Sequence, residues 1–354
     1  MRILIVKISA FGDIIHALPI LPYLKKIKPG AQIYWAVDRQ FEELLKGNPY
    51  LDGIFSLPIR QWKKQFRVGV IGEAFRLIRS LRTYRFDICF DVQGNTKSGL
   101  VSFLSGAKLR CGFDKIGVRE FPNIFFTNRK VNSRPEDIHI SQKVLRVISG
   151  YCGENVSLDD VQPMIYFPDA LREKVREKLY LQGDKINMAI HGGTSWETKK
   201  LRAGQWVDII TAIDEKYRGH GLKIFFTWGS KGEREESAEI IDRLVSSGIG
   251  PDSFVLCPFM EIKELAAFYS LVDVVIGADT GPIHLAAASG GKTLSYYTAP
   301  RGARTAPVGP RHRFIQADYP CTGCFKMECP ISDRCKETLT PDKFLSPLEE
   351  LLPA

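Results

Sequence analysis

Residues 274–288 constrain the fold more than any other stretch of this chain. They begin with an apolar run, which predicts a buried strand, and continue as Gly-Ala-Asp-Thr-Gly before an Ala-rich helix. Pro282 suits the first turn of that helix, because its missing amide has no helical partner to lose. Helix N-termini attract anions, so the stretch predicts a diphosphate site, with Asp279 and Thr280 in reach of a nucleotide or sugar. The alternative is an ordinary turn in which these two residues cap the helix.

Buried strands alternate with helical segments along the whole chain. We expect strands at residues 3–6, 33–37, 88–91, 188–191, 222–227, 254–256, 273–277 and 293–297. Helices are expected at about residues 12–28, in the later part of the basic segment 60–85, within 167–184, and at 206–217 and 233–246. This alternation predicts an α/β fold with parallel, doubly wound sheets.

The length of 354 residues exceeds one typical core, and the alternation restarts near residue 187. We therefore expect a first Rossmann-like domain at residues 1–170 and a second at 171–330. Two such halves bind ligands in the cleft where they face each other. The remaining segment, 331–354, is expected to pack back towards the first domain.

Composition narrows the function classes. The net charge of +9 favours an anionic partner such as nucleic acid, an acidic glycan or a membrane surface. No stretch is long and apolar enough for a transmembrane helix, and the short apolar run at the N-terminus is interpreted as a strand, not as a signal peptide. The first strand is followed by no Gly-x-Gly-x-x-Gly, and the chain has no Walker A motif, which argues against dinucleotide and ATP-hydrolysing enzymes.

Six motifs occur in a characteristic order. They are Lys-Ile-Ser-Ala-Phe-Gly-Asp-Ile-Ile-His at 7–16, Asp-Val-Gln-Gly at 91–94, Lys-Ser at 97–98, Thr-Ser-Trp-Glu-Thr-Lys-Lys at 194–200, Trp-Gly at 228–229 with Glu233, and Gly-Ala-Asp-Thr-Gly-Pro-Ile-His at 277–284. This set resembles the ADP-heptose:lipopolysaccharide heptosyltransferases, glycosyltransferase family 9, over roughly residues 1–320. Residues 59–64 and 118–120 are most similar to the heptosyltransferase I branch. The resemblance implies a GT-B fold, with the acceptor on the first Rossmann-like domain and the nucleotide sugar on the second.

The resemblance also implies the catalytic residues. Asp13 matches the family's base, which takes the proton of the acceptor hydroxyl. Without the resemblance, the alternative role for Asp13 is that of an N-cap residue of the following helix. Lys199 matches the lysine that stabilises the leaving diphosphate, with a solvated loop as the alternative. Lys200 adjoins it, and the family's usual Trp-Pro pair is replaced here by Leu-Arg-Ala at 201–203.

The donor site implied by the resemblance lies in the second domain. Glu233 would hold the ribose, Trp228 the base, and Asp279 the sugar hydroxyls, while hydroxyls and amides of the turns would hold the diphosphate. The full donor set is Thr194, Ser195, Trp228, Glu233, Asp279, Thr280, Gly281 and His284. For Trp228 and His284, packing in the core is an equal alternative.

The acceptor site is expected in the first domain. Arginine forks and lysine charges suit the carboxylates and phosphates of the lipopolysaccharide inner core. The set is Gly12, His16, Arg60, Lys63, Lys64, Gln93 and Arg119. The alternatives are a solvated basic face for the cations and a structural role for His16. Aromatic residues interleave with the cations, but no nucleic-acid motif accompanies them, so we expect no nucleic-acid partner.

Four of the eight cysteines gather near the C-terminus, at Cys321, Cys324, Cys329 and Cys335. Their compact spacing suits a structural zinc or iron–sulfur site, with reduced thiols, disulfides or a redox role as alternatives. Catalysis needs no cofactor if Lys199 and helix amides neutralise the diphosphate.

The expected function is inverting transfer of L-glycero-D-manno-heptose from ADP-heptose to Kdo of Kdo2-lipid A or a related anionic glycolipid. The expected location is cytoplasmic, peripheral on the inner face of the cytoplasmic membrane. Three alternatives remain: transfer to an inner-core heptose or to a protein, a sugar-nucleotide epimerase with the same fold, and a non-catalytic module that binds anionic glycan or nucleic acid.

Overall fold

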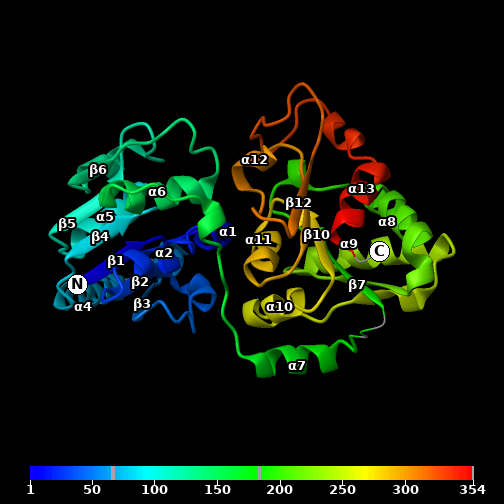
Figure 1. Cartoon of the computed structure of the whole chain (residues 1–354), viewed down its shortest axis with the longest axis horizontal. Helices are drawn as coiled ribbons and strands as arrows, with labels where there is room; N and C mark the ends of the chain where they lie inside the picture. Colours follow the sequence, from blue (N-terminus) through cyan, green and yellow to red (C-terminus); the bar gives the residue numbers. More distant parts are fainter. Residues whose placement is uncertain (65–67, 182, 184, 353–354) are drawn as a thin grey trace. The chain divides into compact units, whose positions relative to one another are not determined.

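A computed structural model of the chain describes residues 1–64, 68–181, 183 and 185–352, with the backbone alone for 63, 64 and 68. The chain divides into two compact units, Met1–Tyr166 and Phe167–Ala354 (Figure 1). Unit 1 therefore ends four residues before the expected boundary at 170. Each unit has one parallel six-stranded sheet, so the expected α/β class is confirmed.

The sheet of unit 1 has the strand order β3-β2-β1-β4-β5-β6. Helices α4 and α5 pack side by side, as do α2 and α6, and the two pairs cover opposite faces. The elements are β1 (Arg2–Val6), α1 (Phe11–Ile15), α2 (Ile20–Ile27), β2 (Gln32–Asp38), η1 (Arg39–Leu44), β3 (Gly53–Leu57), α3 (Ile59–Lys64), α4 (Val68–Thr83), β4 (Ile88–Asp91), α5 (Thr96–Leu104), β5 (Leu109–Phe113), η2 (Phe121–Phe125), β6 (Arg129–Val131), α6 (Ile140–Cys152) and η3 (Leu158–Asp160).

The single helix expected at 12–28 is instead two helices, α1 and α2. Pro19 occupies the N-cap of α2. A proline ring removes one amide donor and clashes with the preceding turn, so a continuous helix through this position would be strained. The break leaves α1 as a short helix at the carboxyl end of β1, and Asp13 lies within it.

The sheet of unit 2 has the order β12-β11-β10-β7-β8-β9. Strand β10 is buried throughout, as parallel strands are when helices cover both faces. The elements are α7 (Asp169–Lys178), β7 (Ile186–His191), η4 (Glu197–Lys199), α8 (Ala203–Tyr217), η5 (Arg218–His220), β8 (Leu222–Phe226), α9 (Lys231–Ser246), η6 (Pro251–Ser253), β9 (Phe254–Leu256), α10 (Ile262–Tyr269), β10 (Val274–Ala278), α11 (Gly281–Ala288), β11 (Thr293–Tyr297), α12 (Gly302–Thr305), β12 (His312–Gln316), η7 (Arg334–Thr338) and α13 (Pro341–Leu351).

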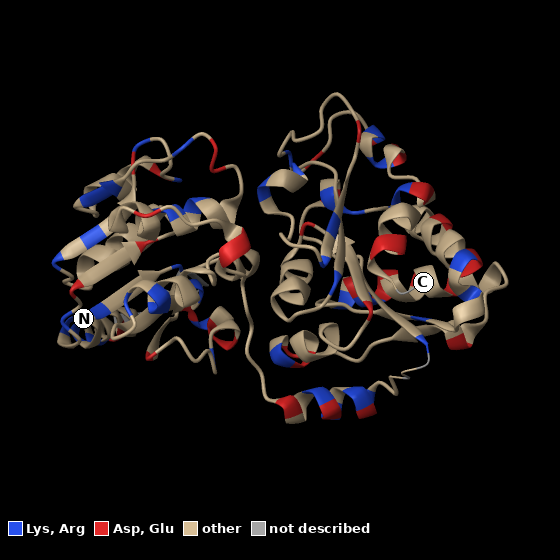
Figure 2. Cartoon of the chain, viewed as in Figure 1, with Lys and Arg blue, Asp and Glu red and all other residues tan. Residues whose placement is uncertain are grey.

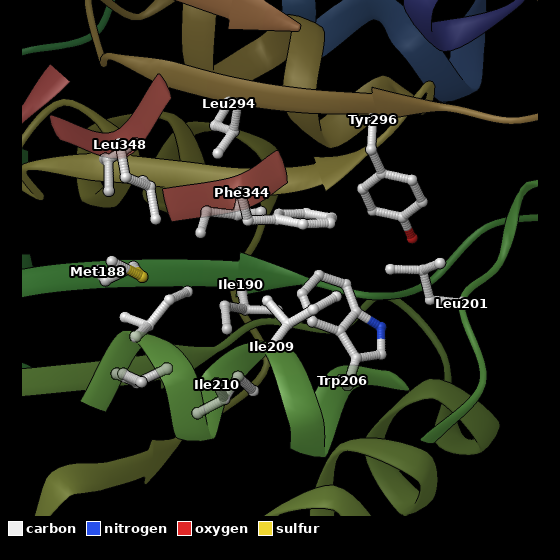
Figure 3. Packing of buried hydrophobic residues seen from close by; sticks show 14 of the residues in the cluster. Met188, Ile190, Leu201, Trp206, Ile209, Ile210, Leu294, Tyr296, Phe344 and Leu348 are labelled. Atoms are coloured by element: carbon white, nitrogen blue, oxygen red, sulfur yellow. The ribbon is translucent and has the colours of Figure 1, made fainter. Parts of the chain in front are cut away.

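The C-terminal helix α13 packs on α8, β11 and β12, within unit 2. Figure 3 shows Phe344 and Leu348 of α13 among the core side chains of that unit. The Phe344 ring lies 6.0 Å from Tyr296 and 6.4 Å from Trp206, measured between ring centroids. We expected residues 331–354 to pack towards the first domain, but these contacts make α13 part of the second core.

Among the residues that the structure describes, no helix has both the length and the apolar character needed to cross a bilayer.

Candidate functional site

Three neighbouring strands of unit 2 bring the expected donor residues to one edge of the sheet. Strands β10, β7 and β8 are adjacent and parallel, so their carboxyl ends meet at the same edge. Asp279 and Thr280 follow β10, Thr194 and Ser195 follow β7, and Trp228 follows β8. Ligands of open α/β sheets bind at this edge.

The centre of this group is an ion pair between Lys199 and Asp279. The Lys199 Nζ donates to Asp279 Oδ2 at 2.6 Å and to the Asp279 backbone oxygen at 3.1 Å. The same ammonium lies 4.7 Å from the ring centroid of Trp196, within cation–π range. On the other side, His284 Nε2 lies 3.3 Å from Asp279 Oδ1.

These contacts keep Asp279 ionised. Burial alone would raise its pKa, but the hydrogen bond and charge of His284 and the Lys199 ammonium hold the pKa well below the ordinary range. An ionised carboxylate is a strong acceptor for sugar hydroxyls.

The N-terminus of α11 lies beside this pair. Thr280 occupies the N-cap position, but its side chain caps none of the first amides and instead donates to the Ala278 oxygen at 3.3 Å. The interpretation of Thr280 as a side-chain cap is therefore wrong. The first-turn amides of Gly281 and Ile283 stay available to an anion, and the helix dipole adds to the charge of Lys199.

Glu233 occupies the first turn of α9 and faces the β7 turn. Its Oε2 accepts from the Gly229 amide at 2.7 Å, which fixes the carboxylate at the end of β8. Gly193 makes room for it, because a Cβ on this glycine would lie 2.3 Å from the Glu233 carboxyl carbon. Trp228 is half-buried, with its Nε1 donating to the Cys257 oxygen at 2.7 Å and its ring 5.7 Å from Phe259. These contacts fix the indole directly after the end of β8.

The two adjacent lysines point to different partners. Lys199 contacts Asp279, whereas Lys200 forms an ion pair with Glu236 of α9. Thr194 is half-buried and accepts from the Trp196 amide at 3.4 Å, and Ser195 is exposed. The lysine that lies with the other donor candidates is thus Lys199.

In unit 1, Asp13 lies at the corresponding carboxyl edge, after β1. Its Oδ2 accepts from the Ala10 amide at 3.3 Å and lies 3.6 Å from Arg119 Nη1. Within the described residues, Asp13 Oδ1 has no hydrogen-bond partner. The helix-capping contact therefore uses one oxygen of this carboxylate and leaves the other without a hydrogen bond in the described part of the chain.

Lys7 is a buried cation that the sequence analysis did not select. It directly follows β1, is almost fully buried, and donates one long hydrogen bond of 3.4 Å to the Val92 oxygen. Burial lowers the pKa of the Lys7 ammonium, against the opposing charge of nearby Asp13. A charged residue at the end of an otherwise apolar strand was the signal available in the sequence.

Two of the expected acceptor residues make internal contacts. Gln93 Oε1 accepts from the Ile8 and Ser9 amides at 2.6 and 3.1 Å, so Gln93 holds the turn that leads to Asp13. His16 is buried and its Nδ1 lies 3.0 Å from Ser141 Oγ of α6. These contacts match the structural alternative for His16.

The remaining acceptor candidates are distributed around the same edge. Gly12 lies in α1, next to Asp13. Arg60 lies in the first turn of α3, after β3, and it donates from its amide to Asp38 Oδ2 at 3.0 Å and from its guanidinium to Gln40 Oε1 at 2.6 Å. The side chains of Lys63 and Lys64 lie outside the described residues.

The C-terminal cysteines are free thiols. The Asp333 amide donates to Cys329 Sγ at 3.2 Å, and burial, then the nearby Cys321 and Cys329, raise the pKa of the Cys335 thiol. In the described part of the chain, no three His, Cys, Asp or Glu side chains are arranged to hold a metal ion. The zinc or iron–sulfur site expected at Cys321, Cys324, Cys329 and Cys335 is therefore not formed by these side chains as placed.

Two parallel six-stranded sheets covered by helices match the GT-B fold of solved heptosyltransferase structures. The family profile "Glycosyltransferase family 9 (heptosyltransferase)" matches residues 74–334, and the chain belongs to this family.

Similar proteins agree with this assignment. The chain is 28% identical to lipopolysaccharide heptosyltransferase 1 of Campylobacter coli, over 99% of both chains. It is 25% identical to lipopolysaccharide heptosyltransferase 1 of Pseudomonas aeruginosa, over 93% of this chain and 87% of that protein. Among solved structures, Escherichia coli heptosyltransferase WaaC with ADP matches with a TM-score of 0.77 and 21% identity, over 99% of this chain and 100% of WaaC.

Proposed function

We propose that this heptosyltransferase transfers L-glycero-D-manno-heptose from ADP-heptose to a Kdo residue of the lipopolysaccharide inner core, with Kdo2-lipid A as acceptor. The observation that carries the proposal is the arrangement of Lys199, Asp279 and the N-terminus of α11 at one sheet edge. This arrangement presents a cation and amide donors for binding a diphosphate. It also presents an ionised carboxylate for binding sugar hydroxyls. The names of the full-length relatives support the choice of lipopolysaccharide as acceptor.

The donor is held by unit 2 in this proposal. The diphosphate lies between the Lys199 ammonium and the amides of α11, with Thr194 and Ser195 close to its oxygens. Asp279, supported by His284, accepts hydrogen bonds from heptose hydroxyls. Glu233 accepts hydrogen bonds from the ribose hydroxyls, and Trp228 lies along the base. Both assignments rest on position, since the Glu233 carboxylate and Trp228 lie at the carboxyl end of β8.

The chemical step is a displacement with inversion at the anomeric carbon. Asp13 Oδ1 takes the proton of the acceptor hydroxyl, and the acceptor oxygen forms its bond to the anomeric carbon. The bond from that carbon to the diphosphate oxygen breaks, and ADP leaves with the electron pair. Lys199 and the α11 amides stabilise the charge that develops on the leaving group. The mechanism assigns no step to a metal ion or to the cysteines.

The acceptor is held by unit 1. Arg119, next to Asp13, and Arg60 supply guanidinium groups for the Kdo carboxylates, and we assign Lys63 and Lys64 to the same anionic glycan. The lipid anchor of such an acceptor keeps the enzyme peripheral to the inner face of the cytoplasmic membrane.

A substrate panel tests this proposal. The purified chain is incubated with ADP-heptose or UDP-N-acetylglucosamine, and with Kdo2-lipid A, an inner-core acceptor that already carries heptose, or no acceptor. The proposal predicts ADP release and a gain of one heptose in mass only for ADP-heptose with Kdo2-lipid A. Transfer confined to the heptose-bearing acceptor would contradict the Kdo assignment, and no use of ADP-heptose with any acceptor would contradict the donor assignment.

A further inference from the structure

Unit 1 exposes a group of large apolar side chains on three elements, α4, α5 and η2. Between 45% and 66% of each side chain is exposed on α4 and α5, and up to 73% on η2. We call this group the apolar face, and its members are Ile71, Phe75, Leu100, Phe103, Phe121 and Phe125. Contiguous exposed apolar groups on a protein surface mark interaction sites.

The three elements form one continuous layer. Helix α5 packs against both α4 and η2 (Figure 1). The inner sides of α4 and α5 rest on the same core, through Leu77, Leu81 and Val101. Phe103 of α5 lies 6.2 Å from Phe126, the residue that follows η2, and within η2 the Phe121 and Phe125 rings lie 5.9 Å apart, measured between ring centroids. The exposed side chains therefore point outward from one layer.

The apolar face is held rigidly at η2. Asn123 of η2 is buried and donates to Asp91 Oδ2 at 2.6 Å and to the Asn95 oxygen at 2.8 Å. These bonds fix η2 to the ends of β4 and α5, so Phe121 and Phe125 stay on the outside. Phe121 is two residues from Arg119, which lies beside Asp13. The apolar face thus borders the candidate acceptor site.

The charge of the chain is concentrated in the same unit. Residues 1–166 include 25 Lys and Arg against 15 Asp and Glu, and residues 167–354 include 24 against 25. The segment 68–130, which contains the apolar face, has 11 cationic residues and five acidic ones. Figure 2 shows these cations on unit 1.

Cations lie among the apolar side chains, and the nearby acids already have partners. Arg79 continues the exposed stripe of Ile71 and Phe75 at helical spacing, and the Arg110 guanidinium lies 5.4 Å from the Phe103 ring. Glu73 accepts from Trp62 Nε1 at 2.9 Å, and Glu120 accepts from the Thr96 amide at 2.9 Å. Both carboxylates keep their negative charge, so the positive character of this surface rests on the excess of cationic over acidic residues in segment 68–130.

We propose that the apolar face docks on the surface of an anionic phospholipid bilayer. The aromatic and aliphatic side chains enter the boundary between headgroups and acyl chains, and the arginines lie beside lipid phosphates. The role of this docking rests on the proposed function, since a lipid-linked acceptor must reach Asp13 from the membrane. A water-soluble protein partner would match the apolar side chains but leave the excess of positive charge unexplained.

Vesicle flotation with the full chain tests the proposal. The variants are the α4 pair Ile71→Ser/Phe75→Ser and the η2 pair Phe121→Ser/Phe125→Ser. The matched control is Ile138→Ser/Met164→Ser, which removes two exposed apolar side chains of unit 1 outside α4, α5 and η2. Vesicles contain either phosphatidylglycerol with phosphatidylethanolamine or phosphatidylcholine alone.

We expect the unmodified chain to bind the anionic vesicles and not the phosphatidylcholine vesicles. Each apolar pair should weaken binding by about tenfold or more, because two side chains no longer insert even partly into the boundary between headgroups and acyl chains. The control pair should leave binding unchanged. Equal binding by all variants would overturn the proposal. So would a dimer in sedimentation that the serine pairs dissociate without affecting vesicle binding, since the face would then join two copies.

An activity measurement separates this proposal from the proposed function. With Kdo2-lipid A in anionic vesicles, the serine pairs should lower the rate, and with the deacylated, water-soluble acceptor they should not. If the unmodified chain uses neither acceptor, the proposed function fails while the flotation result still decides the membrane proposal. If the serine pairs lower both rates equally, the residues act on the glycan and the membrane proposal fails.

Discussion

The Lys199 ammonium lies 2.6 Å from Oδ2 of Asp279, although 80 residues separate the two in the chain. The pair joins the loop after β7 to the carboxyl end of β10. It places the cation proposed for the diphosphate next to the carboxylate proposed for the sugar. In the proposed function, the diphosphate and the heptose of the donor therefore bind next to each other at this pair.

Replacing Lys199 tests its role in leaving-group departure. Lys199→Ala should lower kcat by about 10²–10³-fold, the usual effect of losing one strong electrostatic stabiliser. Lys200→Ala is the matched control, because it removes an adjacent ammonium that pairs with Glu236 instead. Steady-state ADP release measures both. Equal losses in the two variants would show that the loop needs positive charge in general and not Lys199.

Gly193 provides a test of the Glu233 position. A Cβ at residue 193 would lie 2.3 Å from the Glu233 carboxyl carbon, so Gly193→Ala must displace that carboxylate. The KM for ADP-heptose should rise, whereas the free energy of unfolding should change little, because the displaced atoms belong to the end of a flexible side chain. Gly204→Ala, at a position with open space around it, is the control and should change neither. An unchanged KM in Gly193→Ala would remove Glu233 from the donor site.

His191 predicts a pH dependence of stability. Burial lowers its pKa from 6.5 to about 4, so the unfolded chain binds the proton more readily. His191 therefore does not lower the free energy of unfolding above about pH 6.5. As the pH falls from there towards 4, the preferred protonation of the unfolded chain lowers that free energy by about 3 kcal/mol in total. Denaturant unfolding between pH 4 and 7 should show a flatter profile for His191→Asn. His220→Gln, which removes an exposed histidine, should keep the slope of the unmodified chain. Identical slopes in all three would contradict the prediction.

Phe344 tests whether α13 belongs to the core of unit 2. Its ring is fully buried between Trp206 and Tyr296. Phe344→Ala should lower the free energy of unfolding by about 3–5 kcal/mol, since it leaves a cavity. Ser346→Ala, on the exposed side of the same helix, should have little effect. Thermal and chemical unfolding of both variants measure this difference, and similar values would show that α13 contributes no core packing.

Much of the fold could be predicted from the sequence, because buried parallel strands are nearly continuous apolar runs. The strands expected at 3–6 and 273–277 correspond to β1 and β10. Strands β3, β5, β6 and β12 were not expected. Strand β6, for example, is the short segment Arg-Lys-Val, and two of its three side chains are exposed. The split of α1 from α2 depends on Pro19, whose effect the apolar periodicity concealed.

The candidate site was only partly predictable. Motifs placed Asp13, Lys199 and Asp279 after strands, and within each parallel sheet such segments meet at the carboxyl edge of that sheet. The sequence has no signal for which of Lys199 and Lys200 pairs with Asp279, because that choice depends on packing between distant segments. Likewise, the turn amides held by Gln93 and the contact of His16 with Ser141 arise from tertiary structure.

The most direct test of the central claim is acceptor-dependent ADP release by the unmodified chain, Asp13→Asn and the control Asp159→Asn, each with ADP-heptose and Kdo2-lipid A. Asp159 lies in an exposed turn of unit 1. If Asp13 Oδ1 is the base, Asp13→Asn should keep the fold and the donor affinity but lose about 10²–10⁴-fold in kcat, and Asp159→Asn should match the unmodified chain. ADP release that is independent of the acceptor, or an Asp13→Asn variant with full transfer activity, would contradict the account.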